Sequence, residues 1–253
     1  MSSLYFLGNT TSYITIPNNV GLNFENQDFT VEWFQYQTDS NPFPRIFQKG
    51  TLTSSTSSIG VSIEGGRFYY WRNNTYYLVA TLSSSQYKNK WVHFAICRSS
   101  GTTTIYMNGT SIFTLADTYN YTNTADLLIS NESSLTTSAA FGGYIYYLHF
   151  VKGVAKYTSN FTVTTSIPSV LPQTTLLLTA SGFSGSLGNT ATSTAGTFAI
   201  YPSIDPSLPP AAPASLVGRS LFADNNRVYY KPNSLASGGI GGLRNHRRKA
   251  RRT

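Results

Sequence analysis

Charged residues, cysteine and long hydrophobic runs are all scarce in this sequence. Only 11% of the 253 residues are charged, and Cys97 is the single cysteine, so an intrachain disulfide is excluded. No run reaches the roughly 18 apolar residues that a membrane span needs. The first residues, MSSLYFLGNTTSY, have neither the basic region nor the apolar run of a secretory signal peptide. The sequence therefore predicts no disulfide scaffold, no membrane span and no signal peptide.

Motifs of the common enzyme classes are missing as well. The sequence has no G-x-S-x-G motif and no Walker-type loop, and its histidines have no acid or cysteine at a useful spacing. His93 alternates with Trp91 and Ala95 in a strand-like run, which favours a structural role over that of a catalytic base. Cys97 continues the same face, and we interpret it as a buried, inert thiol. We predict that the protein is not an enzyme and holds no cofactor.

Strand-forming residues are abundant instead. The chain contains 18 Tyr and 15 Phe, and aromatic and β-branched side chains fit the pleated surface of a sheet. Period-2 alternation, the pattern of a half-buried strand, recurs between clusters of Gly, Asn and Ser, and Phe29, Val31 and Trp33 share one face of such a run. We expect strands at residues 12–17, 29–35, 59–63, 67–71, 91–98, 103–108, 127–130, 143–151 and 174–179.

Turn chemistry supports an all-β chain. Glu64-Gly65-Gly66 and Asn108-Gly109 supply residues that tolerate a positive φ, as tight hairpins require. No capped amphipathic segment of helical length is present. The sequence therefore predicts antiparallel strands joined by short turns.

The composition changes after residue 183. Residues 184–197 are rich in Ser, Gly, Thr and Ala, and residues 201–215 (YPSIDPSLPPAAPAS) contain five prolines, which predicts an extended linker. Residues 1–218 contain nine basic and nine acidic side chains, whereas residues 219–253 contain nine basic and one acidic, so the whole excess of +8 lies there. We divide the chain into a folded domain at 1–183, a linker at 184–218 and a basic tail at 219–253.

The basic tail is a candidate polyanion-binding segment. Its cationic block can neutralise phosphates and release their counterions, which gives salt-dependent binding without sequence preference. An acidic protein surface or a nuclear-targeting role fits the same block, whereas solubility alone is served at least as well by acids. The predicted polyanion-binding residues are Arg244, Arg247, Arg248, Lys249, Arg251 and Arg252.

An aromatic run at residues 67–77 (RFYYWRNNTYY) is a candidate recognition surface. Exposed Tyr and Trp rings stack on sugars and are frequent in protein interfaces. The alternative is that alternate side chains of the run fill the core. Phe68 and Tyr70 would then face one side of the sheet and Tyr69 and Trp71 the other. At most half of the run would be free to bind. The candidate glycan or protein contacts are Tyr69, Trp71, Tyr76 and Tyr77.

The order of four segments resembles the laminin G-like branch of the concanavalin A-like superfamily. Residues 12–17 and then 29–34 resemble its opening strands, the second of FTVEFWF type. Residues 90–98 and 102–109 (KWVHFAICR, TTTIYMNG) resemble its W-H-h-A-h-x-R … h-Y-h-N-G hairpin, where h is hydrophobic. Residues 141–151 (FGGYIYYLHFV) resemble its late F-x-G-x-I-D-D-h-R-h strand, and residues 152–168 (KGVAKYTSNFTVTTSIP) resemble the KGTALYTSNFTPPTSP segment of phage and environmental-virus proteins.

This resemblance spans about residues 4–183 and implies a two-sheet antiparallel β-sandwich, a concanavalin A-like jelly roll, whose first and last strands pair. Two departures limit what it carries over. Tyr146 and Tyr147 stand where relatives often have acids that could hold calcium, so we predict no metal site. The Glu-x-Asp-x-Glu strand of β-glucan-cleaving relatives is missing, and the nearest carboxylates, Glu25 and Asp28, lie in a turn-like stretch.

Three functions fit this plan. The first is a virion structural protein, either capsid-associated or part of a fibre or appendage, located in the virion. Its partners would be other coat proteins and, through the tail, nucleic acid. The second is a carbohydrate-binding, lectin-like module for host glycans, which is compatible with the first in a viral attachment protein. The third is a cellular nucleic-acid-binding protein. Fold alone does not choose among them.

Overall fold

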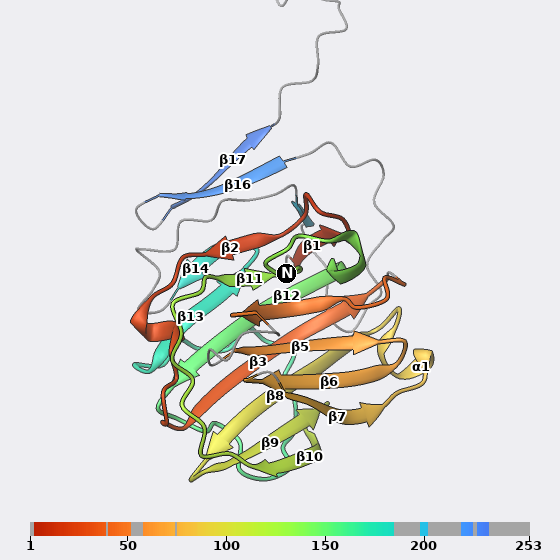
Figure 1. Ribbon diagram of the computed structural model, residues 1–253. Coiled ribbons are helices and arrows are strands. Elements are labelled where there is room, and N and C mark those ends of the chain that lie inside the picture. Colours follow the sequence, from red (N-terminus) through yellow and green to blue (C-terminus); the bar gives the residue numbers. More distant parts are fainter. Residues whose placement is uncertain are drawn as a thin grey trace, which may run out of the picture.

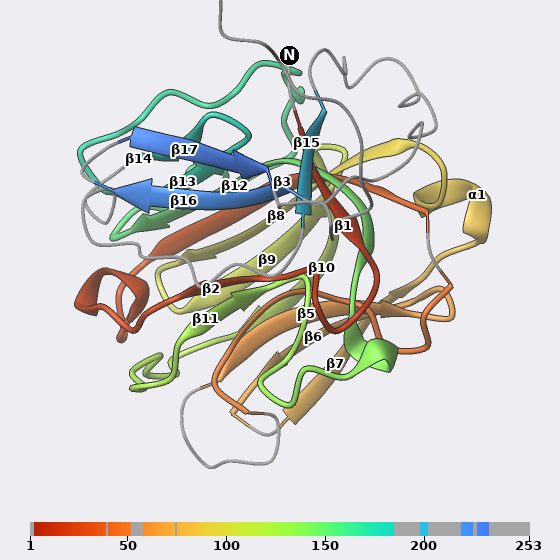
Figure 2. The same cartoon turned by 90° about the horizontal axis from the view of Figure 1, so that it is seen from above.

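The computed structural model describes residues 3–38, 40–51, 58–73, 75–184, 198–201, 219–224 and 227–232. Within these residues two antiparallel sheets stack as a sandwich, which confirms the predicted fold class (Figures 1 and 2). Helical structure there is confined to α1 (Ser84–Tyr87) and two 3-10 turns, η1 (Val20–Leu22) and η2 (Thr137–Ala139). No helix in this described part is long and apolar enough to cross a membrane.

The larger sheet has nine strands. Its main path runs β10-β9-β8-β3-β12-β1-β15, with β13 on β12 and β14 on β13. Its strands are β1 (Ser3–Leu7), β3 (Phe29–Gln37), β8 (Trp91–Ser99), β9 (Thr102–Met107), β10 (Thr110–Ala116), β12 (Gly142–Lys152), β13 (Thr174–Thr179), β14 (Gly182–Ser184) and β15 (Phe198–Tyr201).

The first and last strands of the predicted domain meet differently from the expectation. β1 pairs with the first part of β12, where Leu4 lies opposite Ile145, and β13 pairs with its second part, where Leu178 lies opposite Leu148. Strand β12 has 11 residues, whereas β1 has 5 and β13 has 6. One edge of β12 therefore holds both strands end to end, and they do not pair with each other.

The smaller sheet has six strands in the order β2-β11-β4-β5-β6-β7, and in Figure 1 its strands β5, β6 and β7 lie in front of β3 and β8. The strands of this sheet are β2 (Ile14–Ile16), β4 (Arg45–Lys49), β5 (Ile59–Glu64), β6 (Arg67–Arg72), β7 (Thr75–Thr81) and β11 (Leu127–Ile129).

Four strands of the two sheets, β1, β4, β7 and β10, were not predicted from the sequence. Edge strands β7 and β10 bury few side chains, whereas β4 is buried on both faces, so all three lack period-2 alternation.

Both predicted hairpin turns are confirmed. Gly65 and Gly66 have φ values of 57° and 90° between β5 and β6. Asn108 and Gly109 have φ values of 48° and 79° between β9 and β10. A side chain at such angles is strained, which explains the Gly and Asn found there.

The core lies between the sheets and contains one face of β3. Phe29, Val31 and Trp33 are fully buried in it, as the alternation predicted. The opposite face of β3, with Glu32 and Phe34, is buried too. Residues 153–173, which we call the covering segment, join β12 to β13 and lie over that face.

Some described strands fall in the predicted linker and tail. β15 pairs with β1, and β16 (Arg219–Asp224) pairs with β17 (Arg227–Pro232). Apart from Ser184 at the end of β14, the other residues of the predicted linker lie outside the described residues, as do all six predicted polyanion-binding residues from Arg244 to Arg252. The division into domain, linker and tail stays a prediction.

Candidate functional site

The aromatic run at residues 67–77 forms most of the β6–β7 hairpin. Strand β6 turns Phe68 and Tyr70 into the core, where both are fully buried. The side chains of Tyr69 and Trp71 therefore lie on the outer face of the six-stranded sheet. This is the division that the alternation of the run predicted.

Strand β7 adds side chains to the same outer face. Leu78 lies opposite Tyr69, and Tyr76 lies opposite Trp71. Tyr77 lies opposite Tyr70 and packs against the core, with the two ring centroids 6.3 Å apart. The structure therefore brings together three of the four candidate contact residues and turns Tyr77 away.

Trp71 differs from the expectation of an exposed recognition residue, because its side chain is 0% exposed. The guanidinium of Arg45 lies 4.6 Å from the indole centroid, and the Tyr76 ring lies 5.9 Å from it. A Cβ at Gly60 on the neighbouring strand would lie 2.5 Å from the indole, so the ring rests against glycine backbone. Trp71 supports this face and does not offer its own ring.

On β6 and β7, the accessible aromatic and aliphatic side chains of the outer face are Tyr69, Tyr76 and Leu78, which we call the platform. Tyr76 is 48% exposed and Leu78 is 49% exposed, while Tyr69 is partly exposed. Partial burial raises the pKa of the Tyr76 hydroxyl, so this group is neutral and can donate a hydrogen bond at neutral pH. The platform therefore combines apolar surface with hydroxyl groups.

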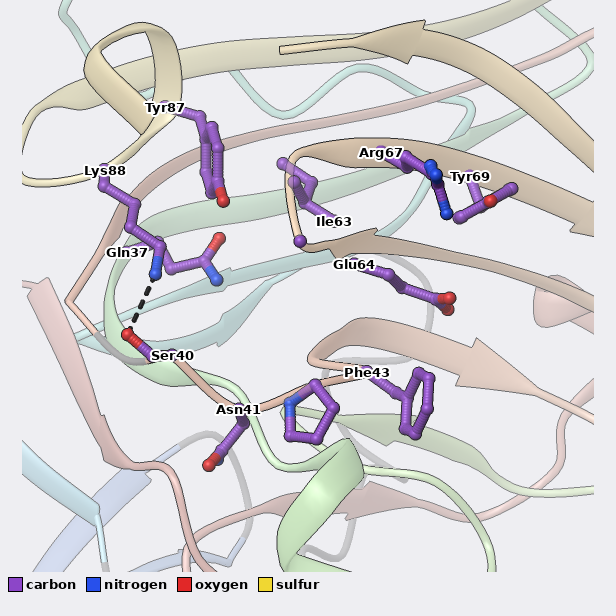
Figure 3. A pocket seen from close by; sticks show the side chains of 12 residues that line it. Gln37, Ser40, Asn41, Phe43, Ile63, Glu64, Arg67, Tyr69, Tyr87 and Lys88 are labelled. Atoms are coloured by element: carbon purple, nitrogen blue, oxygen red, sulfur yellow. Dashed lines mark hydrogen bonds between the residues drawn. The ribbon is translucent and has the colours of Figure 1, made fainter. Parts of the chain in front are cut away.

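A pocket of about 330 Å³ adjoins the platform and shares Tyr69 with it. Figure 3 shows side chains from three segments around it: the loop after β3, the β5–β6 hairpin, and the end of α1. The Lys88 ammonium donates a hydrogen bond to the Ser40 hydroxyl at 3.0 Å across one side. The lining residues are Gln37, Ser40, Asn41, Pro42, Phe43, Ile63, Glu64, Gly65, Arg67, Tyr69, Tyr87 and Lys88.

Glu64 is the single carboxylate among the described lining residues of this pocket, and two hydrogen bonds fix its position. Its Oε1 accepts from Arg45 Nη1 at 2.7 Å and from the Ser62 hydroxyl at 2.7 Å. Arg45 also lies 3.9 Å from Glu132 and stacks on Trp71, so it ties the pocket to the platform. This surface can hold an uncharged ligand that has an apolar face and several hydroxyl groups.

Sequence reasoning missed part of this site. Phe43 is exposed but lies in a loop, where no periodicity marks it. Leu78 belongs to β7, which was not expected, although alternation from Tyr76 would have placed both on one face. Glu64 was predicted only as part of a turn, and Arg67 only as the first residue of a strand and of the aromatic run.

The opposite sheet carries a cluster of ionisable side chains beneath the covering segment. Glu32 is 0% exposed and accepts from His149 Nδ1 at 2.9 Å, from the Tyr157 hydroxyl at 2.8 Å, and from the Lys156 ammonium. His93 Nε2 lies 3.5 Å from its other oxygen. Burial alone would raise the pKa of Glu32, but hydrogen bonds from His149 and His93 and the charge of Lys156 hold it well below the usual range. Glu32 is therefore charged at neutral pH.

Residues that the sequence assigned to structure are buried on this side. His93 packs and pairs with Glu32, in keeping with its predicted structural role. Cys97 is free and buried, and burial raises the pKa of its thiol to about 11, as expected of an inert thiol. Tyr146 and Tyr147 are buried as well. The described residues contain no group of three or more His, Cys, Asp or Glu side chains suited to a metal ion.

Comparison with known proteins places this architecture. Residues 7–155 match the laminin G model described as the concanavalin A-like lectin/glucanases superfamily. A solved Bacteroides ovatus protein classed as carbohydrate-binding is similar at 16% identity and a TM-score of 0.58, over 79% of this chain and 59% of its own length. The heptameric SAP-like pentraxin of Limulus polyphemus is similar at 14% identity and a TM-score of 0.55, over 82% of this chain and 97% of its own. A search of curated protein sequences found no match.

Proposed function

This chain belongs to the concanavalin A-like lectin/glucanases superfamily, and from that premise we propose that it is a carbohydrate-binding protein without catalytic activity. The observation that carries the proposal is the exposed platform of Tyr69, Tyr76 and Leu78, which shares Tyr69 with a pocket of about 330 Å³ lined by both polar and apolar side chains. Aromatic rings stack on the apolar faces of sugars while polar groups bind their hydroxyls. The similar Bacteroides ovatus protein, classed as carbohydrate-binding, supports the same substrate class.

The chemistry of the pocket supports binding over cleavage. Glycoside hydrolysis of the usual kind needs two carboxyl groups that flank the bond. Glu64 is the one carboxylate among the described lining residues, and its Oε1 already accepts from Arg45 and Ser62. One carboxylate cannot supply both of the carboxyl groups that this reaction needs. Glu64 is suited to accept hydrogen bonds from sugar hydroxyls.

A glycan array with the full chain tests this function. We expect weak binding to a subset of glycans, which Tyr76→Ala and Tyr69→Ala each reduce at least tenfold because each removes a stacking ring. Val170→Ala is the matched control, since Val170 is exposed on the covering segment over the other sheet. The melting temperature of each variant shows that the fold is kept. Absence of any bound glycan, or binding unchanged in both tyrosine variants, contradicts the proposal.

A virion structural role stays a prediction from the sequence, and it is compatible with glycan binding in an attachment protein. It rests on the resemblance of residues 152–168 to segments of phage and environmental-virus proteins and on the +8 charge of residues 219–253. Purified particles from the source should contain this chain in stoichiometric amount. A chain found only outside particles would remove this role and leave the glycan proposal standing.

The predicted polyanion-binding residues have a separate test. Full-length protein should bind duplex nucleic acid with little sequence preference and a slope of log K against log salt no steeper than about −5. A chain ending at Gly242 should lose nearly all of this binding with its melting temperature unchanged. Equal binding by both chains would place the basic surface elsewhere in the molecule.

A further inference from the structure

A second pocket lies on the other side of the sandwich, beneath the covering segment. It has a volume of about 330 Å³, and its floor is formed by side chains of the nine-stranded sheet. The floor residues are Glu32, His93 and Tyr147. The covering segment supplies the rest of the lining, which consists of Lys156, four apolar and four hydroxyl-bearing residues: Lys156, Tyr157, Phe161, Thr162, Val163, Thr164, Pro168, Ser169 and Leu171.

The cover of this pocket is held in place by several contacts. Phe161 stacks on Tyr157, with ring centroids 3.5 Å apart, and packs on Tyr106 of β9 at 5.4 Å. The backbone N–H of Phe161 also donates to the carbonyl of Gly109 at 2.9 Å. Val163 packs against the cluster that contains Tyr147. These contacts fix the wall of the pocket that the covering segment forms.

The charges on the floor cancel within the protein. Glu32 accepts hydrogen bonds from His149, Lys156 and Tyr157, and Lys156 is its counter-ion. His149 is held in turn by the Thr174 hydroxyl, 2.8 Å from its Nε2. A charged ligand in this pocket would find no unpaired counter-charge among the described lining residues. An uncharged ligand disturbs none of these pairs.

Two polar groups on the floor have no partner in the described part of the chain. Tyr147 is 2% exposed and its hydroxyl makes no hydrogen bond there; burial raises the pKa of this phenol, so it is a protonated donor. His93 is 1% exposed, and its Nδ1 is buried without a partner. Because Nε2 faces the Glu32 carboxylate, we assign the ring proton to Nε2, which leaves Nδ1 as an acceptor. The two ring centroids are 6.3 Å apart.

A ligand hydroxyl satisfies both groups, because it donates and accepts at once. We propose that the pocket beneath the covering segment binds a small, uncharged, hydroxyl-bearing ring of about the size of one sugar unit. Tyr147 donates to a ligand hydroxyl and His93 Nδ1 accepts from one. Phe161, Val163 and Leu171 face the apolar side of the ring. The volume lies at the lower end of small-molecule pockets, roughly 300–1,000 Å³, which limits the occupant to a single ring of this kind.

This site is independent of the platform, since the two lie on the outer faces of different sheets. Its test uses the full chain with glucose, galactose, mannose, N-acetylglucosamine and myo-inositol as probes, and glucuronate as the charged comparison. The chain has three histidines, so their ring signals can be resolved by proton NMR. We expect one neutral probe to shift the His93 signal in a saturable manner.

Matched variants separate the two sites. Tyr147→Phe removes only the unpartnered hydroxyl and should weaken probe binding at least tenfold with little change in melting temperature. Tyr146→Phe removes the hydroxyl of the neighbouring residue, which does not line the pocket, and should leave binding unchanged, as should Tyr76→Ala on the platform.

Each other outcome overturns the inference. If no neutral probe shifts the His93 signal in a saturable manner, the pocket is not a ligand site. Binding that survives Tyr147→Phe but is lost in Tyr76→Ala belongs to the platform alone. Tighter binding of glucuronate than of glucose shows that Lys156 is available to an anion, which contradicts the charge balance given above.

Discussion

The outer faces of the two sheets differ in their exposure to solvent. On the six-stranded sheet, Tyr76 and Leu78 are about half exposed beside an open pocket. On the nine-stranded sheet, strand β3 is buried on both faces because residues 153–173 lie over it. Alternation along a strand states which side chains share a face. Whether that face meets solvent depends on another part of the chain.

The polar chemistry of the two faces differs for the same reason. The carboxylate of Glu64 on the open side keeps some contact with water, and its side chain is 17% exposed beside Arg45. The carboxylate of Glu32 on the covered side has lost all contact with bulk water and depends wholly on its protein partners. Loss of one partner is therefore more costly on the covered side.

The largest expected loss of stability comes from removing Trp71, the buried indole on the open face. Trp71→Ala should lower the free energy of unfolding by about 3–5 kcal/mol, because it empties a fully buried ring site beneath Arg45. Urea unfolding measures this. Tyr76→Ala on the same face is the control and should change stability by less than about 0.5 kcal/mol. Equal effects of the two would mean that the indole is accessible and belongs to the platform.

A similar effect is expected on the covered face. Glu32→Gln leaves Lys156 without its counter-ion and should cost about 3 kcal/mol in urea unfolding. Glu25→Gln is the matched control, because Glu25 pairs with Lys152 at 3.2 Å with a side chain that is 43% exposed. Its cost should be below about 1 kcal/mol. A Glu32→Gln variant as stable as the control would show that the cluster contributes little.

The attachment of the covering segment can be isolated with two turn glycines. Both Gly65 and Gly109 have a positive φ, so alanine should cost about 1 kcal/mol at each. A Cβ at Gly65 meets nothing within 4 Å, whereas a Cβ at Gly109 would lie 2.0 Å from the carbonyl oxygen of Phe161. Gly109→Ala should therefore cost about 1 kcal/mol more than Gly65→Ala. It should also speed hydrogen exchange at the Phe161 amide; equal costs and equal exchange would mean that the segment is held elsewhere.

The smallest expected effect is the loss of stability when the pH is lowered. The pKa of Glu32 is held well below its value of about 4.3 in an unfolded chain, so its stabilising contribution is complete above that pH. As pH falls below it, the unfolded state takes up a proton first, and about 1 kcal/mol is lost per pH unit. The stability difference between the native chain and Glu32→Gln should shrink between pH 4 and pH 3. A difference independent of pH over this interval would contradict the shift.

Much of the fold could be predicted from the sequence, and less of the candidate site. The alternation of Phe29, Val31 and Trp33 identified a core face, and the glycines of the two hairpins marked their turns. The division of the aromatic run into inner and outer members was also predictable, because it follows from the pleat of one strand. The burial of Trp71 could not be predicted, because it depends on Arg45 from another strand.

The sequence by itself determined that this chain forms antiparallel strands, that Phe68 and Tyr70 share a face, and that the excess charge lies in residues 219–253. These properties are local: the pleat repeats every two residues, and charge is a sum. Only the tertiary structure decided that Glu32 meets Lys156, far along the chain, and that Tyr69 joins a pocket with residues of three segments. Such contacts depend on register and on the path of a connection without regular structure, and neither leaves a periodic mark in the sequence.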